Sequence, residues 1–244
     1  MRSRSPVGIL GGMGPAAGVE LARLFVAACE EMLEARGEPV RDQSYPEHVL
    51  LQSPFPDRTS ALLCGETAHV EDCMSAALDR LATLGVRSVA IACNTAHAWH
   101  AGLQARHPAL ELLDVGQVVA DELRRQGVTQ VGLLATTGTY LSGVYDGRLR
   151  AAGIACITPE PREREVLMRG IYEGVKAGDR PLARQLFTQV ADALCARHDL
   201  QVLILGCTEI PLALAPCDLH REVSMLDPAA LLARALARRA LADL

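Results

Sequence analysis

The chain alternates between short apolar runs typical of buried strands and longer amphipathic stretches typical of helices, and this alternation starts again near its middle. The run Val7–Leu10 is followed by glycines and then by a helical pattern from Pro15 to Ala35. The segment Val131–Thr139 repeats the same order, an apolar run followed by a turn of small residues. Strands that alternate with helices build parallel sheets covered by helices. The sequence therefore predicts an α/β fold made of two similar lobes.

The restart sets the predicted lobe boundary. We predict a first α/β lobe of residues 1–112 that also takes in residues 224–244, and a second α/β lobe of residues 113–223. Each lobe is expected to hold a mainly parallel sheet flanked by helices. With 244 residues, half of them apolar, the chain is long enough for two small cores. A cleft between two lobes is the default place for a ligand.

Two short cysteine motifs occupy matching places in the two predicted lobes. The first reads Cys-Asn-Thr-Ala-His from Cys93 to His97, and the second reads Cys-Thr-Glu-Ile-Pro from Cys207 to Pro211. Each follows an apolar run and so lies at the carboxyl end of a strand, where open α/β sheets bind ligands. A following helix favours the thiolate over the thiol. One thiolate and one thiol could take a proton from one face of a carbon and return a proton to the other.

The remaining six cysteines are expected to be structural. The chain has no Cys-x-x-Cys pair and no histidines at ligand spacing, so we predict no metal site. Cys29, Cys73 and Cys195 fall in predicted helices, Cys156 falls in a predicted strand, and Cys64 and Cys217 carry no chemical signal.

Two cationic residues indicate an acidic ligand. Arg58 follows a predicted strand after a short loop and could hold a carboxylate through two parallel hydrogen bonds. Lys176 is the one lysine in a chain that otherwise uses arginine, which favours a role for a compact, mobile ammonium group. The backbone amides of residues 11–14 could bind an anion. The same loop lacks the spacing of a dinucleotide site, so no cofactor is predicted.

Composition excludes other classes of partner. The net charge is −5 and both signs are mixed along the chain, so there is no basic surface for nucleic acid. The apolar run Val7–Leu10 is too short for a signal peptide or a membrane span. We therefore expect a cytoplasmic protein that contacts neither nucleic acid nor membrane.

Taken together, the motifs resemble those of the aspartate/glutamate racemase family. The resemblance rests on Gly11–Pro15, Pro56–Thr59, Cys93–His97, Gly132–Thr139 and Gly206–Pro211. It implies two pseudo-symmetric lobes with the active site between them, and racemisation without pyridoxal phosphate or metal. It also implies a homodimer. Gly12-Met13 and Glu209 stand where glutamate racemases of cell-wall synthesis usually carry Asp-Ser and His, so the chain looks more like the aspartate racemase branch.

The resemblance also implies roles for individual residues. Cys93 and Cys207 would be the catalytic acid/base pair. Independently of the resemblance, the positions of His97 and Glu209 just after the cysteines favour structural or supporting roles: His97 could cap the helix or tune Cys93, and Glu209 could relay a proton near Cys207 or stabilise the first turn of the helix. Phe55 and Trp99 are bulkier than expected near this site and could reshape its side-chain pocket. Substrate contacts would come from Met13, Gln52, Arg58, Asn94, Thr95, Thr137, Thr208 and Lys176.

The predicted activity is racemisation of an acidic amino acid, most of all aspartate and then glutamate, by proton transfer at Cα. Three alternatives stay open at this point. The chain could be a maleate-isomerase-like or decarboxylase-like enzyme with related cysteines. It could bind an acidic metabolite without catalysis, which would need Arg58 and Lys176 but neither thiol. It could also sense redox state through a disulfide between Cys93 and Cys207.

Overall fold

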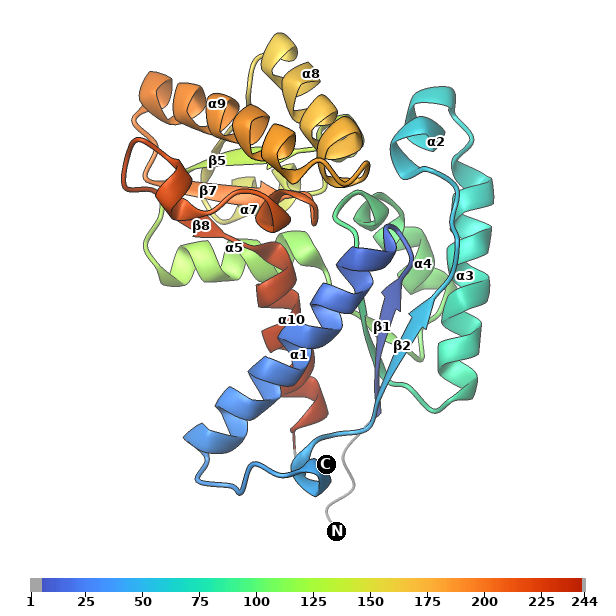
Figure 1. Ribbon diagram of the computed structural model, residues 1–244. Coiled ribbons are helices and arrows are strands. Elements are labelled where there is room, and N and C mark those ends of the chain that lie inside the picture. The colour runs from blue at the N-terminus through green and yellow to red at the C-terminus, as the bar shows by residue number, and fades with distance from the viewer. Residues whose placement is uncertain (1–5, 243–244) are drawn as a thin grey trace. The chain divides into compact units, whose positions relative to one another are not determined.

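The computed structural model describes residues 6–242, and predictions that concern residues 1–5 and 243–244 lie outside this range (Figure 1). The described chain divides into two compact units. The first contains residues 6–114 and 229–242, and the second contains residues 115–228. Within the described residues the strands form two four-stranded sheets, one in each unit, and every pairing is parallel. This confirms the predicted α/β class.

The first sheet has the strand order β2-β1-β3-β4. In its central pairing Val7 lies opposite Ser88 and Leu10 opposite Ile91. Both central strands are buried along their whole length, as parallel strands covered on both faces must be. The strands are β1 (Val7–Gly11), β2 (His48–Gln52), β3 (Ser88–Ile91) and β4 (Glu111–Leu112).

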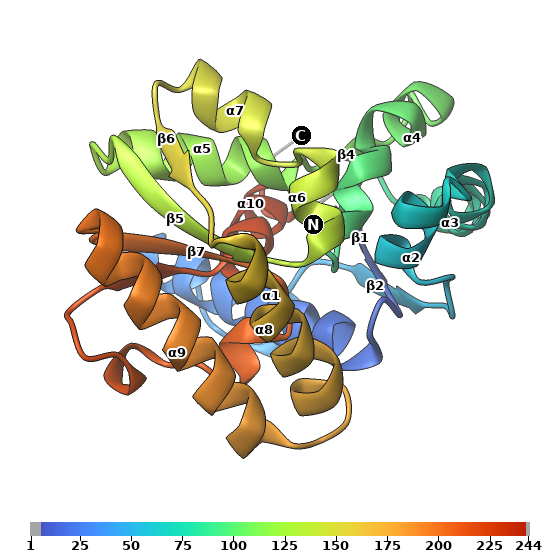
Figure 2. The same ribbon diagram turned by 90° about the horizontal axis from the view of Figure 1, so that it is seen from above.

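Helices cover both faces of the first sheet. Figure 1 and Figure 2 show α1 on one side of the sheet and α3 on the other. The core between α3 and the sheet contains Leu10, Met74, Leu78 and Ile91, all fully or almost fully buried. The helices of this unit are α1 (Pro15–Ala35), η1 (Asp42–Ser44), α2 (Arg58–Cys64), α3 (Thr67–Thr83), η2 (Thr95–Trp99), α4 (His100–Arg106) and α10 (Pro228–Ala240).

The second sheet repeats the arrangement of the first. Its order is β6-β5-β7-β8, so in each unit the first strand lies between the second and the third. In the central pairing Leu133 lies opposite Ile204 and Ala135 opposite Gly206. The strands are β5 (Gln130–Ala135), β6 (Ala155–Ile157), β7 (Val202–Gly206) and β8 (Ser224–Leu226).

In the second unit α5 and α7 lie on one face of the sheet, and α8 and α9 lie on the other (Figure 2). The core on the α9 side is built around Phe187, Leu194 and Leu203, none of which is exposed. The helices are α5 (Val115–Arg125), α6 (Thr137–Ser142), α7 (Asp146–Ala151), α8 (Pro161–Arg169), the π-helix η3 (Gly170–Val175), α9 (Arg180–His198), η4 (Ile210–Leu212) and η5 (Pro216–Asp218).

The π-helix η3 packs unusually close to α9. A Cβ atom on Gly170 would lie 2.5 Å from the Phe187 ring, and one on Gly174 would lie 2.7 Å from the Ala183 methyl group. Because η3 continues directly from α8, it ends that helix in a wider π-helical turn before the chain turns into α9. This wider turn ends immediately before Lys176.

The observed units correct the predicted lobe boundaries at two places. Residues 224–228 were predicted in the first lobe, but they belong to the second unit because β8 pairs in parallel with β7. Residues 113 and 114 belong to the first unit instead of the second, since Leu113 continues from β4 and its amide donates to the Val89 carbonyl at 2.9 Å. The prediction therefore missed that the short strand β8 completes the second sheet.

The helix α10 is held in the first unit by polar contacts as well as by its apolar face. The Arg239 guanidinium binds both Glu111 oxygens at 2.8 and 2.9 Å, and the Ser88 hydroxyl donates to Glu111 at 2.9 Å. Arg234 lies 3.4 Å from Glu31 on α1. These contacts link the end of the chain to β4 and α1, which lie more than one hundred residues earlier.

We predict that Glu111→Gln lowers the free energy of unfolding at neutral pH by roughly 0.5–1 kcal/mol, because the Arg239 pair is about half exposed. The Arg239 guanidinium holds the folded pKa of Glu111 below its usual range. The contribution is therefore present above the unfolded pKa of about 4.3 and is lost as pH falls through the folded pKa. Urea unfolding at several pH values, in a double-mutant cycle with Arg239→Gln, measures it. Equal stabilities of the variant and the parent at pH 7 would contradict the prediction.

Candidate active site

In the first unit the parallel pairing brings three loops to one edge of the sheet. The loops follow β1, β2 and β3, which are neighbours in the order β2-β1-β3. Since the carboxyl ends of parallel strands meet at one edge, the residues after Gly11, Gln52 and Ile91 lie there together. These loops carry Met13, Arg58 and Cys93, so the structure gathers the residues predicted in the first lobe into one half-site.

The turn between β1 and α1 is shaped by Gly12, whose φ is +97°. A Cβ atom at this position would lie 2.0 Å from the Ser53 carbonyl oxygen, so no other residue fits. The Met13 side chain is buried in the core of the first unit. Gln52 is exposed, and its amide oxygen lies over two further glycines, Gly11 and Gly18.

Arg58 is buried. An exposed surface position would have argued against a role in ligand binding. Arg58 is the first residue of α2, after Asp57, whose carboxylate accepts from the Ser60 amide. Its guanidinium donates to the Pro56 carbonyl at 2.9 Å and to the Met13 carbonyl at 2.7 Å. Its Nε is buried and has no hydrogen-bond partner in residues 6–242. Arg58 thus joins the loops after β1 and β2 and brings a cationic group to them.

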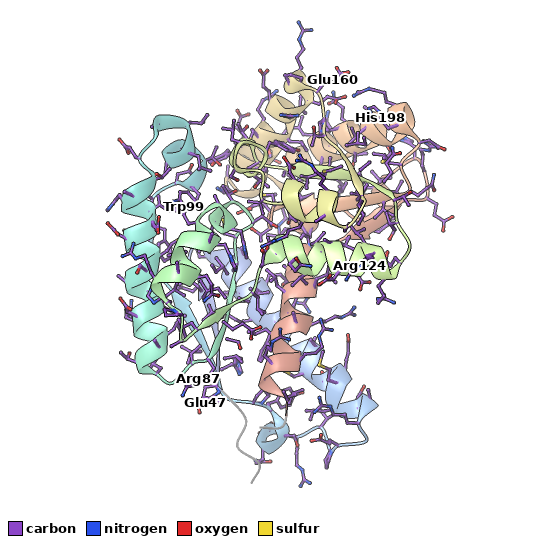
Figure 3. All side chains as sticks on the ribbon, turned by 180° about the vertical axis from the view of Figure 1, so that it is seen from behind. Glu47, Arg87, Trp99, Arg124, Glu160 and His198 are labelled. Carbon is purple, nitrogen blue, oxygen red and sulfur yellow. The ribbon has the colours of Figure 1, made fainter. Side chains whose placement is uncertain are left out.

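The cysteine motif of the first unit is buried against the same core. Cys93 is 8 % exposed, and Asn94 and Thr95 are also buried. Trp99, two residues after the motif, is also buried (Figure 3). Its indole N–H donates to the Thr67 carbonyl at the start of α3 at 3.0 Å. Trp99 therefore contributes to the core between η2 and α3.

His97 is buried as a neutral imidazole. Burial and, to a smaller extent, the neighbouring His100 lower its pKa to about 4, and Asp114 and a hydrogen bond to the Ile91 backbone only partly oppose them. The two imidazole rings are stacked, with centroids 5.9 Å apart. At neutral pH His97 is therefore a polar packing group at the end of β3 and carries no positive charge toward the cysteine motif.

The second unit presents an equivalent half-site at the carboxyl ends of β5 and β7. Thr136 caps α6 through its hydroxyl, which accepts from the Thr139 amide at 3.1 Å. The Thr137 amide points to the Met168 sulfur at 3.3 Å. The Tyr140 hydroxyl donates to the Leu133 carbonyl at 3.0 Å, which fixes the turn after β5 onto the strand itself.

Cys207 and Glu209 are in direct contact. The Cys207 thiol donates to Oε2 of Glu209 at 2.9 Å, and the Thr208 hydroxyl donates to the same oxygen at 3.0 Å. Cys207 and Glu209 are both buried, and Thr208 is half-buried. The carboxylate is thus turned back onto the sulfur, a contact that the sequence spacing alone does not reveal.

Lys176 is exposed and follows the π-helix η3. Its Nζ lies 4.1 Å from the centre of the Tyr172 ring, a cation–π contact. Sequence reasoning did not single out Tyr172 or Tyr140. Tyr172 could have been found from the sequence, because it lies four residues before Lys176 and residues four apart on a helix are neighbours. No comparable pattern pointed to Tyr140.

The remaining cysteines have structural surroundings. Burial raises the pKa of Cys156 to about 12 and that of Cys195 to about 11, so both are thiols at neutral pH. No disulfide joins two cysteines within the described residues. Cys64 and Cys217 are exposed at the end of α2 and in η5.

The helices that follow the two catalytic candidates differ in length. Cys93 precedes the 3-10 helix η2, which leads directly into α4, whereas Cys207 precedes the three-residue helix η4. A short 3-10 turn has only a small dipole, so helix-dipole stabilisation of a thiolate is weaker than expected, most of all at Cys207. At Cys207 the direct contact with Glu209 is therefore a stronger local influence than the short helix.

Residues 6–242 contain neither a metal-binding cluster of side chains nor a membrane-spanning helix. No group of three or more His, Cys, Asp or Glu side chains there could hold a metal ion. None of the helices in this range combines the length and apolar character needed to cross a membrane.

A sequence model of the Asp/Glu/Hydantoin racemase family matches residues 10–236, which includes both half-sites. The chain belongs to this family. Glutamate racemase from Ectopseudomonas mendocina is 35 % identical over 170 residues, which cover 66 % of this chain and 60 % of that enzyme. The match thus spans less than two thirds of the length of that relative.

Solved structures have the same fold. The Picrophilus torridus aspartate racemase superposes with a TM-score of 0.79 at 27 % identity, covering 97 % of this chain and 94 % of that one. An aspartate racemase homologue from Pyrococcus horikoshii superposes with a TM-score of 0.73, covering 97 % and 99 % of the two chains. Its 24 % identity supports likeness of fold alone.

The lowered pKa of His97 makes the stability of the racemase fold depend on pH. Between the ordinary histidine pKa of about 6.5 and the folded pKa of about 4, the unfolded chain binds a proton that the folded chain does not. Stability should therefore fall as pH decreases through this window, by an amount on the order of 3 kcal/mol from this residue. Urea unfolding of the parent and of His97→Gln between pH 7 and pH 4 measures the effect.

His198 provides the matched control, because it is exposed at the end of α9 (Figure 3). His198→Gln should retain the parent's pH dependence, whereas His97→Gln should flatten it. An NMR titration that places the His97 imidazole near pH 6.5 would show that the ring is not held neutral.

Proposed function

We propose that this racemase interconverts the enantiomers of an acidic amino acid, aspartate before glutamate, by two-base proton transfer between Cys93 and Cys207. The observation that carries the proposal is the repeated placement of the two cysteines. Each follows the third strand of its sheet, and that strand pairs with the first strand in both units. We further propose that the two half-sites face each other across an inter-lobe cleft.

In the proposed reaction one cysteine begins as a thiolate and the other as a thiol. The thiolate takes the Cα proton, and the electron pair of the broken C–H bond stays on the substrate as a carbanion. The thiol then donates its proton to the opposite face of Cα. The sulfur that began as a thiolate ends as a thiol and the other sulfur ends as a thiolate, so no cofactor enters the balance.

Arg58 and Lys176 would recognise the two carboxylates of the substrate. Arg58 is already fixed by two carbonyl groups, so it offers a rigid planar donor with little loss of side-chain entropy on binding. Lys176 is exposed beside Tyr172 and offers a mobile point charge. Hydroxyl and amide groups of Asn94, Thr95, Thr137 and Thr208 would supply further contacts.

Two observations support aspartate as the substrate. Glu209 and Gly12-Met13 distinguish this chain from the residues usual in glutamate racemases. The Picrophilus torridus aspartate racemase is similar over almost the whole chain. The homodimer and the cytoplasmic location expected from the sequence stay predictions.

The two-base scheme predicts that Cys93→Ala and Cys207→Ala each reduce racemisation of aspartate by about 10²–10⁴-fold, because each removes one of the two proton carriers. Chiral chromatography measures the product. In deuterated water the parent should place deuterium at Cα of the enantiomer formed. Cys64→Ala and Cys217→Ala, which change exposed cysteines in the two units, serve as controls. Near-normal turnover by either catalytic variant would reject the scheme.

The single lysine allows a direct test of substrate recognition. The amines available to an acylating reagent are Lys176 and the chain's α-amino group, and hydroxylamine treatment removes acyl groups from any modified thiols. We expect acylation to raise KM for aspartate strongly, because it removes the positive charge, and we expect bound aspartate to slow the acylation of Lys176 in peptide mass maps. The α-amino group is the internal control for reagent reactivity. Equal acylation of Lys176 with and without saturating aspartate would contradict the proposed contact.

A further inference from the structure

The two cysteine motifs differ in the residue two positions after the sulfur. This residue is Thr95 in the first unit and Glu209 in the second. The difference is chemical, because the Glu209 carboxylate lies 2.9 Å from the Cys207 sulfur. The two half-sites have matching topology but different side chains two positions after the sulfur.

The surroundings of Glu209 keep its carboxylate on the sulfur. Glu209 is only 7 % exposed, and its Oε2 accepts from both the Cys207 thiol and the Thr208 hydroxyl. The backbone of Glu209 is fixed as well, since its carbonyl accepts from the Leu212 amide at 3.2 Å. A buried carboxylate and a thiol in this contact form a coupled pair, in which a negative charge on one group disfavours a negative charge on the other.

The phenol of Tyr140 on α6 interacts with Cys207 from another element, and burial raises the pKa of this phenol above its ordinary value. Arg164 on α8 lies 4.5 Å from the centre of the Tyr140 ring. Tyr140 is therefore neutral at working pH, whereas the Glu209 carboxyl group is in direct contact with the sulfur.

We propose that Glu209 is a positioning residue that accepts and returns the Cys207 thiol proton, so that the Cys207–Glu209 pair acts as the proton carrier of the second half-site. This inference rests on the proposed racemase function. It extends that function by making the two half-sites inequivalent.

The proton balance of the pair is as follows. Before reaction the thiol proton moves from Sγ to Oε2, which leaves a thiolate and a neutral carboxylic acid with a total charge of −1. The thiolate then takes the Cα proton, the carbanion keeps the electron pair, and the pair becomes neutral. Release of the carboxylic acid proton to water restores the charge of −1.

In the opposite direction the neutral pair donates its thiol proton to the carbanion. The new thiolate then accepts the Glu209 proton, which leaves a thiol and a carboxylate. Neither direction requires a thiolate and a carboxylate 2.9 Å apart, the state that charge repulsion disfavours most.

The test uses Glu209→Gln, which keeps the size of the side chain but cannot accept the proton. Glu209→Asp serves as the conservative variant. Glu222→Gln is the matched control, because Glu222 is an exposed carboxylate in the same unit. For aspartate in both directions, kcat of Glu209→Gln should fall by about 100-fold with little change in KM, and Glu209→Asp should recover part of the loss.

A second readout requires no substrate. Iodoacetamide modifies thiolates, so peptide mass mapping over a range of pH gives a separate alkylation curve for each cysteine. In Glu209→Gln the midpoint of the Cys207 curve should move to lower pH, because no carboxylate opposes the thiolate, while the Cys93 curve stays in place. Faster alkylation together with slower racemisation is a combination that a purely structural role of Glu209 would not produce.

The outcomes separate this inference from the function on which it rests. A Cys207 curve that does not move, or racemisation by Glu209→Gln equal to that by Glu222→Gln, overturns the role of Glu209. If the parent racemises no amino acid, the proposed function fails, and the alkylation curves still decide whether Glu209 controls the proton on Cys207.

Discussion

The parallel pairing of the first and third strands in each unit is the constraint from which the candidate site follows. It is β1 with β3 in the first unit and β5 with β7 in the second. Parallel strands end at a common edge, so the pairing brings loops from distant parts of the sequence together without specific contacts between the loops. The buried character of these strands sets the register, because both of their faces must pack against helices.

Within that frame, local contacts make the two half-sites chemically different. In the first unit the cationic Arg58 is anchored by backbone carbonyls, and the imidazole after the cysteine is buried and neutral. In the second unit the charged group beside the sulfur is the Glu209 carboxylate. The repeated fold therefore places charged side chains differently in its two halves.

The sequence was sufficient to predict a helix or strand where one hydrophobic periodicity dominated the segment. The bounds of α1 agree with the predicted range, because Pro15 and Gly37 mark the helix ends. The order of the two repeated halves also followed from pattern alone. Sequence-based prediction failed at β8, a three-residue strand that is too short to show an alternation of polar and apolar residues. This strand is defined by its pairing with β7.

The side-chain geometry of the site was also beyond the sequence. The spacing of Cys207 and Glu209 is compatible with a carboxylate turned toward the sulfur or away from it, and only the fold selects the first. Likewise, Arg58 could have been solvated, and its burial depends on carbonyls contributed by Met13, which lies 45 residues earlier. Such contacts depend on where loops meet, and the residue pattern within one loop does not encode that.

The wider turn at η3 has a consequence for how the helix can vary. Each residue of an α-helix advances the chain by about 100° around the axis, so one extra residue within a turn rotates everything beyond it by that angle. Lys176 comes directly after this turn, and Gly170 and Gly174 let the turn pack against α9. With one residue fewer between positions 170 and 175, the chain would leave the helix at a different angle around its axis, so η3 sets the direction in which the chain's one lysine follows.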